Sequence, residues 1–371
     1  MKIGIDARNL VPNLTGIGRY LLEMCRHLAL QGTELILYLP EEPHSPIPPL
    51  AGATIRIANQ RGAIRRMIWA QTELPRLAAR DQIDVFWGPA HRLPFTLDRR
   101  IPRVVTIHDL VWLHAGSTMR RQSWLADRYL MKPAIEGADR IVTVSEATRK
   151  ALQTLVPSAT EKARVVYSGL TKIGHAAAND TLRDHRIDHP YALFVGTLEP
   201  RKNLLNLLEA YSLLADEIRA GLILVIAGGQ GWHLGELGQH IKRLNIEASI
   251  RLTGYVTDDD LAALYSHARL LAMPSLYEGF GFPIIEANAM GVPVLTSNSS
   301  SMPEVAGDAA LLVDPTDIRS ISDGLRRLAT DDALHQQLAN NARANAARFD
   351  WEKSARELLS VFEEAIAVRK H

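Results

Sequence analysis

The chain has 371 residues, a length that suggests two domains. Hydrophobic residues make up 47% and charged residues 22%, a composition typical of a globular protein. Lysine and arginine number 42 against 41 acidic residues, so the net charge of +1 gives no general electrostatic reason to bind nucleic acid. The single cysteine, Cys25, excludes an internal disulfide and a cysteine-rich zinc site, which favours a reducing compartment. Asp6 and Arg8 interrupt the stretch where a signal peptide would be apolar, and the apolar runs fall far short of the ~20 residues that span a bilayer. We therefore expect a cytoplasmic protein.

The first half of the chain alternates short β-branched apolar runs with longer helical patterns. Most of these runs are apolar on both faces, which indicates a parallel sheet covered by helices on both sides. The predicted strands are 2–6, 34–39, 54–57, 85–87, 104–107 and 140–144. A helix predicted over 17–29 follows the first strand, and Gly32 lies just beyond its end.

The pattern breaks over residues 168–190, which are polar and lack periodicity, so we expect a linker there. A second series of predicted strands covers 191–195, 222–226, 250–253, 269–273, 292–296 and 310–313. Its predicted helices cover 203–215, 235–244, 258–267, 283–290, 318–329 and 331–347. Two successive open sheets predict an α/β fold with two Rossmann-like domains, over 1–172 and 188–349. Ligands bind at the carboxyl ends of such strands, so we expect the two sheets to face each other across a cleft.

The last predicted helix, 351–367, carries Trp351, Leu358 and Phe362 on one apolar stripe. Two interpretations stay open. The helix packs back onto the N-terminal domain, or it is an ordinary terminal helix of the second domain.

The segment EGFGFPIIE, residues 278–286, is the strongest motif. It links a predicted strand to a helix, and Pro283 suits the first helical turn. Glycines let the backbone approach a ligand, and N–H groups at a helix start attract anions or sugar hydroxyls. Glu278 in the loop is suited to accept hydroxyl groups. Glu286, expected in the first turn, either stabilises the helix dipole or accepts paired hydroxyls such as those of a ribose.

A second motif, GTLEPRKN, places Arg201 and Lys202 directly before a predicted helix, with Asn203 as its expected N-cap. Two cations are unfavourable at a helix start, and an anionic ligand removes that conflict. Arginine grips a phosphate with two hydrogen bonds and lysine adds a point charge. The alternative is a solvated surface turn.

Two further sites are predicted in the first half. His108 follows a strand at its carboxyl end, where it either faces a ligand or forms a hydrogen bond with Asp109 in the core. Gly16 and Gly18 lie in a loop before a helix, although the spacing does not fit the dinucleotide fingerprint. Gly228, which ends another strand, is interpreted as part of a plain turn.

Together these stretches resemble the family-4 retaining glycosyltransferases of the GT-B fold. The resemblance covers nearly the whole chain. It is carried by TGIGRY, VVTIHDL, IVTVSEATRKAL, FVGTLEPRKNL, SLYEGFGFPIIEANAMGVPVLTSNSSSMPEVAGDAALLVDP and FDWEKSA. Among these motifs, Glu278 and Glu286 with the GFG residues between them are the most specific sign of the family.

The resemblance implies a role for each candidate residue of the second half. Arg201 and Lys202 would hold the nucleotide diphosphate, and Glu286 would bind the ribose. Glu278 would contact the hydroxyls of the donor sugar. The backbone N–H groups of Phe280, Gly281 and Phe282 would lie beside that sugar.

In the first half, the resemblance places His108 near the reacting carbon of the donor sugar. Gly16 and Gly18 would lie against the phosphates or the acceptor. The sequence holds no convincing cluster of carboxylates or histidines for a metal, so we expect a metal-independent enzyme with no cofactor, for which the nucleotide sugar is a substrate. The resemblance also implies retention of the anomeric configuration. No carboxylate is clearly placed as a nucleophile, so we favour same-face attack with the departing phosphate as base.

The opening IDAR…TGIGRY pattern resembles bacterial enzymes that build surface polysaccharides, including lipopolysaccharide, often as mannosyltransferases. We therefore expect GDP-mannose as the donor and a glycan or polyprenyl-linked glycan as the acceptor. A UDP-sugar donor is the alternative. Other hypotheses are a sugar-nucleotide epimerase, a glycogen-synthase-like enzyme, a catalytically inactive binding module and a nicotinamide-dependent oxidoreductase. The incomplete glycine fingerprint disfavours the oxidoreductase.

Two stretches mix cations with large apolar residues. They are 64–69, IRRMIW, and 119–124, MRRQSW. Such stretches can rest on the anionic face of the cytoplasmic membrane. The competing interpretation is an ordinary amphipathic helix whose apolar side faces the core.

Overall fold

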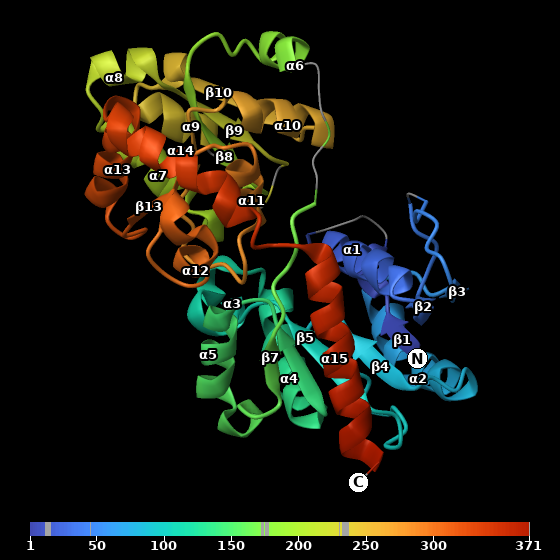
Figure 1. Cartoon of the computed structure of the whole chain (residues 1–371). Coiled ribbons are helices and arrows are strands. Elements are labelled where there is room, and N and C mark those ends of the chain that lie inside the picture. Colours follow the sequence, from blue (N-terminus) through green and yellow to red (C-terminus); the bar gives the residue numbers. More distant parts are fainter. Residues whose placement is uncertain are drawn as a thin grey trace. The chain divides into compact units, whose positions relative to one another are not determined.

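The computed structural model describes residues 1–11, 16–44, 46–171, 174, 178–229, 231 and 237–370. The chain divides into two compact units, coloured by sequence in Figure 1. The first unit contains Met1–Trp112, Arg121–Gly169 and Asp350–His371, and the second contains Leu113–Arg120 and Leu170–Phe349. The division differs from the expected boundaries at the short segment 113–120, which groups with the second unit.

The first unit is built on a parallel sheet of seven strands in the order β3-β2-β1-β4-β5-β6-β7. The strands are β1 (Lys2–Asp6), β2 (Glu34–Leu39), β3 (Ala53–Ile57), β4 (Val85–Gly88), β5 (Arg103–Ile107), β6 (Arg140–Thr143) and β7 (Ala163–Val165). The sequence missed β7, which has only three residues, too few to show a periodic pattern. Its pairing with β6 is what identifies it as a strand.

Helices connect these strands. They include α1 (Gly16–Leu30), α2 (Ala63–Arg80), α3 (Val111–His114), α4 (Arg121–Gly137) and α5 (Glu146–Leu155). The inner strands β1, β4 and β5 are almost completely buried, as expected for a sheet covered on both faces, whereas the edge strand β3 is mostly exposed.

The last helix, α15 (Trp351–Lys370), belongs to the first unit and packs along α1. The Trp351 ring meets Tyr20 with ring centres 5.8 Å apart, and Phe362 meets Trp87 at the same distance. Gly169 allows this packing, because a Cβ at that position would lie 2.4 Å from Trp351. The side chains of α15 are therefore part of the hydrophobic core of the first unit.

The second unit holds a parallel sheet of six strands in the order β10-β9-β8-β11-β12-β13. The strands are β8 (Tyr191–Val195), β9 (Ile223–Ala227), β10 (Ile250–Gly254), β11 (Leu270–Met273), β12 (Val294–Ser297) and β13 (Ala310–Val313). Counted from β8, this is the 3-2-1-4-5-6 order of the Rossmann fold, which confirms the predicted architecture. The order reverses between β8 and β11, so a ligand crevice is expected at the carboxyl ends of those two strands.

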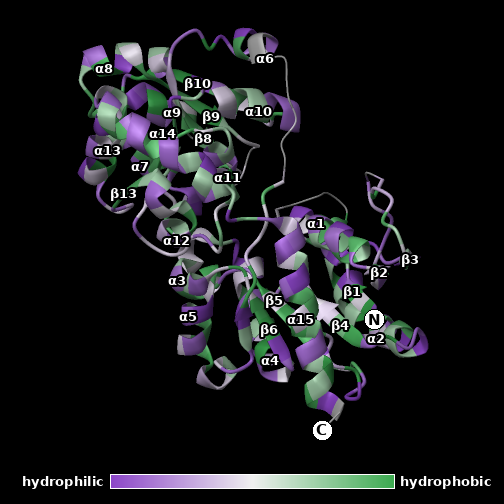
Figure 2. Cartoon of the chain, viewed as in Figure 1, coloured by the Kyte–Doolittle hydropathy of each residue, from purple (hydrophilic) through white to green (hydrophobic). Residues whose placement is uncertain are grey.

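The helices of the second unit follow the predicted pattern with small differences. They are α6 (Ala178–Asp184), α7 (Leu204–Ser212), α8 (Asp216–Gly221), α9 (Leu237–Arg243), α10 (Asp258–His267), α11 (Phe282–Ala289), α12 (Met302–Ala306), α13 (Ile318–Thr330) and α14 (Asp332–Ala346). The helix expected over 203–215 ends at Ser212, and α8 follows as a separate short helix. The expected linker contains α6, which packs against α10. In Figure 2 the sheet strands are largely hydrophobic, whereas the helices mix both kinds of residue.

Candidate functional site

The candidate site of the second unit lies where the strand order reverses. The loop after β8 leads to a 3₁₀ turn, Pro200–Lys202, and the loop after β11 leads to Glu278. The backbone N–H of Leu276 donates to the carbonyl of Arg201 at 2.9 Å and joins the two loops. The topology thus brings Glu278 to the adjacent pair Arg201 and Lys202, although it is more than 70 residues from them in the sequence.

Glycines let these loops approach each other closely. A Cβ at Gly228 would lie 1.9 Å from the carbonyl oxygen of Gly196, and one at Gly231 would lie 1.9 Å from that of Leu198. Gly196 has φ of 144°, and a Cβ there would meet the Lys202 side chain at 3.3 Å. The turn at Gly228, interpreted from the sequence as plain, is therefore a packing requirement of the Arg201–Lys202 loop.

Asn203 occupies the expected N-cap position of α7, but its side chain does not cap the helix. It has a left-handed backbone with φ of 62°, and its Nδ2 donates to the carbonyls of Pro274 at 2.9 Å and Pro315 at 2.7 Å. The predicted capping hydrogen bond is not made, because the Asn203 amide instead joins its own loop to the loops of Pro274 and Pro315. Asparagine is one of the few residues that tolerates this backbone conformation.

Glu278 forms ion pairs with both cations. Its Oε1 lies 2.7 Å from Lys202 Nζ, and its Oε2 accepts a hydrogen bond from Arg201 Nη1. Arg201 also donates to the carbonyl of Tyr277 at 2.8 Å and pairs with Glu199. Burial raises the pKa of Glu278, but the charges of Arg201 and Lys202 outweigh that effect and bring its pKa to about 2. Two carboxylates thus balance two cations at this edge of the sheet.

The GFG segment enters α11 as predicted, with Gly281 as N-cap at φ of 112° and Pro283 in the first turn. Phe280 is buried against Phe282 and Phe349, with ring centres 5.2 and 5.4 Å apart. This packing fixes the loop from behind. In the part of the chain that the structure describes, no hydrogen bond uses the N–H groups of Phe280 or Gly281. Those groups are thus suited to bind a ligand at the helix start.

Glu286 does not lie in the first turn, because α11 begins at Phe282 and Glu286 is its fifth residue. That position is a poor match for the dipole interpretation. Its Oε2 accepts a hydrogen bond of 2.8 Å from the hydroxyl of Tyr265, which is fully buried in α10. Burial and then the charge of Glu286 raise the pKa of Tyr265 well above its ordinary value, so Tyr265 stays a donor. Tyr265 was not predicted as the partner of Glu286, because the two residues lie 21 positions apart on different helices.

In the first unit, His108 directly follows β5 and is 9% exposed. Its ring Nε2 lies 2.7 Å from the carbonyl oxygen of Pro89, and Tyr20 packs edge-on against it with ring centres 4.7 Å apart. Burial, and then the neighbouring His91, lower the pKa of His108 to about 4. The expected hydrogen bond with Asp109 is not made, since the Asp109 carboxylate accepts from the N–H of Val111.

Gly16 and Gly18 lie in the first turns of α1 and not in a preceding loop. No atom would lie within 4 Å of a Cβ at Gly16, so a side chain there would point into open space. A charged pair that was not predicted lies at the end of β1. Asp6, the last residue of β1, is buried and accepts a hydrogen bond of 2.8 Å from Nε of Arg8. An acidic residue at the carboxyl end of a central parallel strand is the signal that could have found it.

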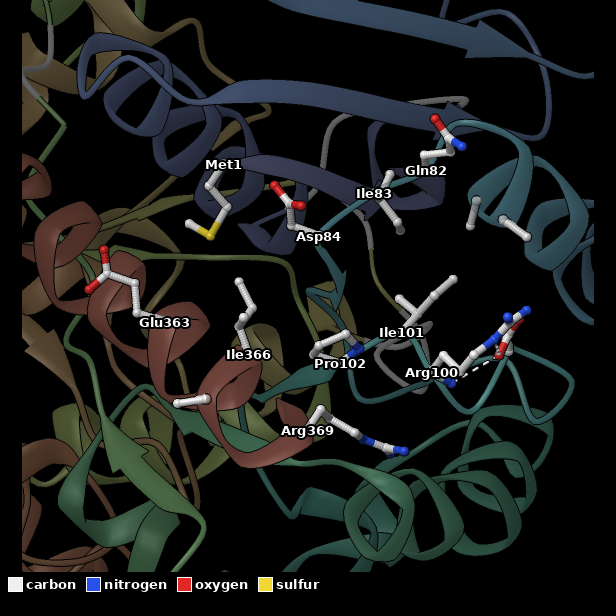
Figure 3. Close-up of a pocket in the computed structure, with 14 residues that line it drawn as sticks. Met1, Gln82, Ile83, Asp84, Arg100, Ile101, Pro102, Glu363, Ile366 and Arg369 are labelled. Carbon is white, nitrogen blue, oxygen red and sulfur yellow. Dashed lines mark hydrogen bonds and ion pairs between the residues drawn. The ribbon is translucent and has the colours of Figure 1, made fainter. Parts of the chain in front are cut away.

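A pocket of about 900 Å³ lies at the amino ends of strands in the first sheet, the ends opposite to the one that His108 follows (Figure 3). Its lining includes Met1, Asp84, Pro102, Ile366 and Arg369, from the amino ends of β1, β4 and β5 and from α15. His108 follows the carboxyl end of β5, so this pocket is separate from the candidate site. The described residues contain no group of three or more His, Cys, Asp or Glu side chains suited to a metal ion. None of the described helices is long and apolar enough to cross a membrane.

Comparisons with known proteins match both halves of the chain to sugar-transfer families. Residues 14–171 match the model described as Glycosyltransferase Family 4, and residues 181–345 match Glycosyl transferases group 1. The O-antigen chain mannosyltransferase B of Escherichia coli is 33% identical over 98% of this chain and 99% of its own length. The serotype-specific mannosyltransferase WbdA of the same species is 31% identical over 68% of this chain and 32% of its own length.

The two-sheet architecture and these matches define a glycosyltransferase. The chain belongs to the family-4 glycosyltransferases. The group 1 domain is in its second half, over residues 181–345. Solved structures agree on the fold. Sucrose-phosphate synthase from Thermosynechococcus elongatus has a TM-score of 0.79 with 19% identity, covering 99% of this chain and 100% of that one. HepE from Anabaena, solved in complex with UDP and glucose, has a TM-score of 0.74 with 18% identity, covering 98% and 99%.

Proposed function

We propose that this enzyme is a retaining mannosyltransferase that moves mannose from GDP-mannose to a glycan or polyprenyl-linked glycan during cell-surface polysaccharide synthesis. The observation that carries the sugar-nucleotide chemistry is the grouping of Arg201, Lys202 and Glu278 at the strand-order reversal of the second sheet. The choice of mannose is supported by the full-length similarity to the O-antigen mannosyltransferase. A UDP-sugar donor is the second candidate, favoured by the UDP-bound structure of similar fold.

The two cations would stabilise the leaving group. A nucleotide diphosphate gains negative charge as its bond to the sugar breaks, and fixed positive groups stabilise that transition state more than the ground state. Arg201 and Lys202 are already held in place by Glu278 and Glu199, so little reorganisation is needed when the diphosphate arrives. The N–H groups of Phe280 and Gly281 would add further donors. These groups supply the stabilisation without a metal ion.

The donor would be oriented by carboxylates at its two ends. Glu286, held by the Tyr265 hydroxyl, would accept the ribose hydroxyls. Glu278 would accept hydroxyls of the sugar. His108 would accept a hydroxyl of the sugar near the reacting carbon, and Gly16 and Gly18 would lie against the phosphates or the acceptor.

Retention would follow from attack on the same face of the sugar as the leaving group. Glu278 is committed to two cations and its pKa of about 2 marks a poor nucleophile and base. The departing phosphate would then take the proton of the attacking hydroxyl. The bond from the anomeric carbon to the diphosphate oxygen breaks, and the bond to the acceptor oxygen forms on the same side.

One experiment tests both the donor and the stereochemistry. Purified enzyme is given GDP-mannose, UDP-glucose or ADP-glucose with a lipid-linked mannose-containing acceptor, and the product is examined by NMR. We expect turnover with GDP-mannose and an α-linked product. Turnover with UDP-glucose alone would transfer the proposal to the second candidate, and a β-linked product would overturn retention.

We also propose that α2 contacts the cytoplasmic membrane that carries a lipid-linked acceptor. Its first turns leave Ile64, Met67 and Ile68 exposed by 71%, 50% and 55%, on one stripe at helical spacing. The stripe continues to exposed Phe95, whose N–H donates to the Gln71 side chain at 2.8 Å. Residues 61–80 hold five arginines and one glutamate. Exposed apolar groups flanked by cations suit an anionic lipid surface.

Sedimentation with vesicles tests this contact. The enzyme should bind phosphatidylglycerol vesicles at low salt and lose binding when Ile64 and Ile68 are replaced by Asp. Leu213, which is 59% exposed in the second unit, offers the matched control, and Leu213→Asp should bind normally. Failure of the wild-type enzyme to bind anionic vesicles at low salt would remove the membrane contact and leave the transfer reaction untouched.

A further inference from the structure

The histidine His91 lies beside His108 in the first unit and has no role in the proposed chemistry so far. It is 7% exposed, and its backbone adopts the left-handed conformation with φ of 62°. Few non-glycine residues adopt that conformation, and histidine is among those enriched in it. The loop that carries His91 folds back tightly after β4. A Cβ at Gly88 would lie only 2.1 Å from the carbonyl oxygen of Arg92, so the turn requires glycine at that position. The loop is thus constrained to deliver this side chain to one place.

That place is the backbone of His108. The N–H of His108 donates to Nε2 of His91 at 3.0 Å, and the backbone N–H of His91 donates to the carbonyl of Thr106 at 2.9 Å. On the other side, the hydroxyl of Thr148 donates to the carbonyl of His108 at 3.2 Å. Both backbone groups of His108 are therefore held by neighbouring elements immediately beyond the end of β5.

The hydrogen bonds also determine where the ring protons lie. A carbonyl oxygen can only accept, so Nε2 of His108 carries the proton that it donates to Pro89. A backbone N–H can only donate, so Nε2 of His91 carries a lone pair, and the neutral His91 ring has its proton on Nδ1. Nδ1 of neutral His108 is then an acceptor. No hydrogen-bond partner of this atom occurs among the residues that the structure describes.

Burial and two ring contacts also favour a neutral His108. Its ring is buried and lies 5.5 Å from that of His91 between ring centres, and Tyr20 covers one side. Burial and the neighbouring His91 both lower the pKa of His108, which keeps the ring uncharged near neutral pH. A neutral ring with one proton committed to Pro89 cannot act as a general acid. It can accept a hydroxyl hydrogen bond through Nδ1.

We propose that His91 is a positioning residue, which fixes the backbone of His108 so that Nδ1 of His108 accepts a hydroxyl hydrogen bond from the bound sugar. This inference rests on the proposed contact between His108 and the donor sugar. The loss of orientation should reduce the rate of the chemical step more than it weakens donor binding, because the error lies in placement at the reacting sugar. His91 itself does not touch the sugar.

The test compares variants that keep or remove the acceptor at position 91. His91→Gln places an amide oxygen near the position of Nε2, whereas His91→Leu fills similar space with no acceptor. We expect His91→Leu to lower kcat at least tenfold with KM for the donor within about twofold, and His91→Gln to recover most of kcat. ¹⁵N NMR of labelled histidine should show the Nε2–H tautomer of His108 in the wild-type enzyme and in both variants, because the carbonyl of Pro89, and not His91, accepts that proton. A melting curve reports whether each variant is folded.

The outcomes separate this inference from the proposed function. Full activity of His91→Leu, or a loss that His91→Gln does not recover, would overturn the positioning role. An Nδ1–H tautomer of His108 in the wild-type enzyme would do the same, because Nδ1 could then not accept a hydroxyl hydrogen bond. Full transfer by His108→Ala would instead overturn the contact between His108 and the sugar. Should His91→Leu not fold, His91→Asn takes its place, since asparagine suits the left-handed backbone but is too short to reach the N–H.

Discussion

The candidate residues of the two units are held by different physical means. In the second unit, Arg201, Lys202 and Glu278 are opposite charges in direct contact. In the first unit, His108 is a neutral ring held by a carbonyl, a second histidine and an aromatic edge. In the proposed reaction, the charged groups would act where charge changes most, at the departing diphosphate, and the neutral acceptor would act where only orientation is needed. The comparison predicts that mutations in the second unit have the larger effects.

The largest effects should come from Lys202→Ala and Glu286→Ala. Each should reduce transfer by two or more orders of magnitude, a loss of about 3 kcal/mol in transition-state stabilisation. Lys202→Ala removes a positive charge that is proposed to stabilise the leaving group, so it should lower kcat. Glu286→Ala removes the proposed contact with the ribose, so it should also raise KM for the donor. Steady-state kinetics with circular dichroism as the folding check measures both. Near-normal rates in both folded variants would contradict the assignment of the second unit as the donor site.

Glu278→Gln should affect stability as well as activity. The pKa of Glu278 is about 2 in the folded state, against an ordinary 4.5, so the charged form stabilises the fold above pH 4.5. That contribution is lost as the pH falls from 4.5 to 2, and the shift corresponds to about 3 kcal/mol over the whole window.

Urea unfolding at pH 5 and pH 3 checks this prediction. The wild-type protein should lose more free energy of unfolding between the two values than Glu278→Gln does. The amide cannot charge, and it leaves Arg201 and Lys202 without their shared partner. Glu363→Gln, at an acid on the rim of the pocket in Figure 3, serves as a control that should keep the wild-type pH dependence. An equal loss of free energy of unfolding in the wild type and in Glu278→Gln between pH 5 and pH 3 would contradict the proposed effect of the ion pairs.

The overall fold and the charged residues of the site were predictable from the sequence, because both depend on short local patterns. Buried strands are short apolar runs, and Arg201, Lys202 and Glu278 occur in the loops that follow two of them. The hydrogen-bond partners were not predictable in the same way. Tyr265 is 21 residues from Glu286 and His91 is 17 residues from His108, and only the tertiary structure brings each pair together. The expected cap at Asn203 is wrong for the same reason, since other loops determine what its side chain contacts. The expected place of Glu286 in the first helical turn is wrong because α11 begins at Phe282.

The smallest effect should come from the pH dependence of the first unit. The pKa of His108 is about 4 in the folded state, against 6.5 ordinarily, so below pH 6.5 the unfolded chain binds a proton that the folded chain refuses. Stability should therefore fall as the pH is lowered through this window, by about 2 kcal/mol between pH 7 and pH 5. Replacing His108 by Gln should remove that part of the dependence, and transfer at pH 7 should fall about tenfold. Because the two pH windows barely overlap, urea unfolding at pH 7, 5 and 3 assigns each loss to one unit. If His108→Gln kept the wild-type loss between pH 7 and pH 5, His108 would not be the buried neutral ring on which the comparison of the two units depends.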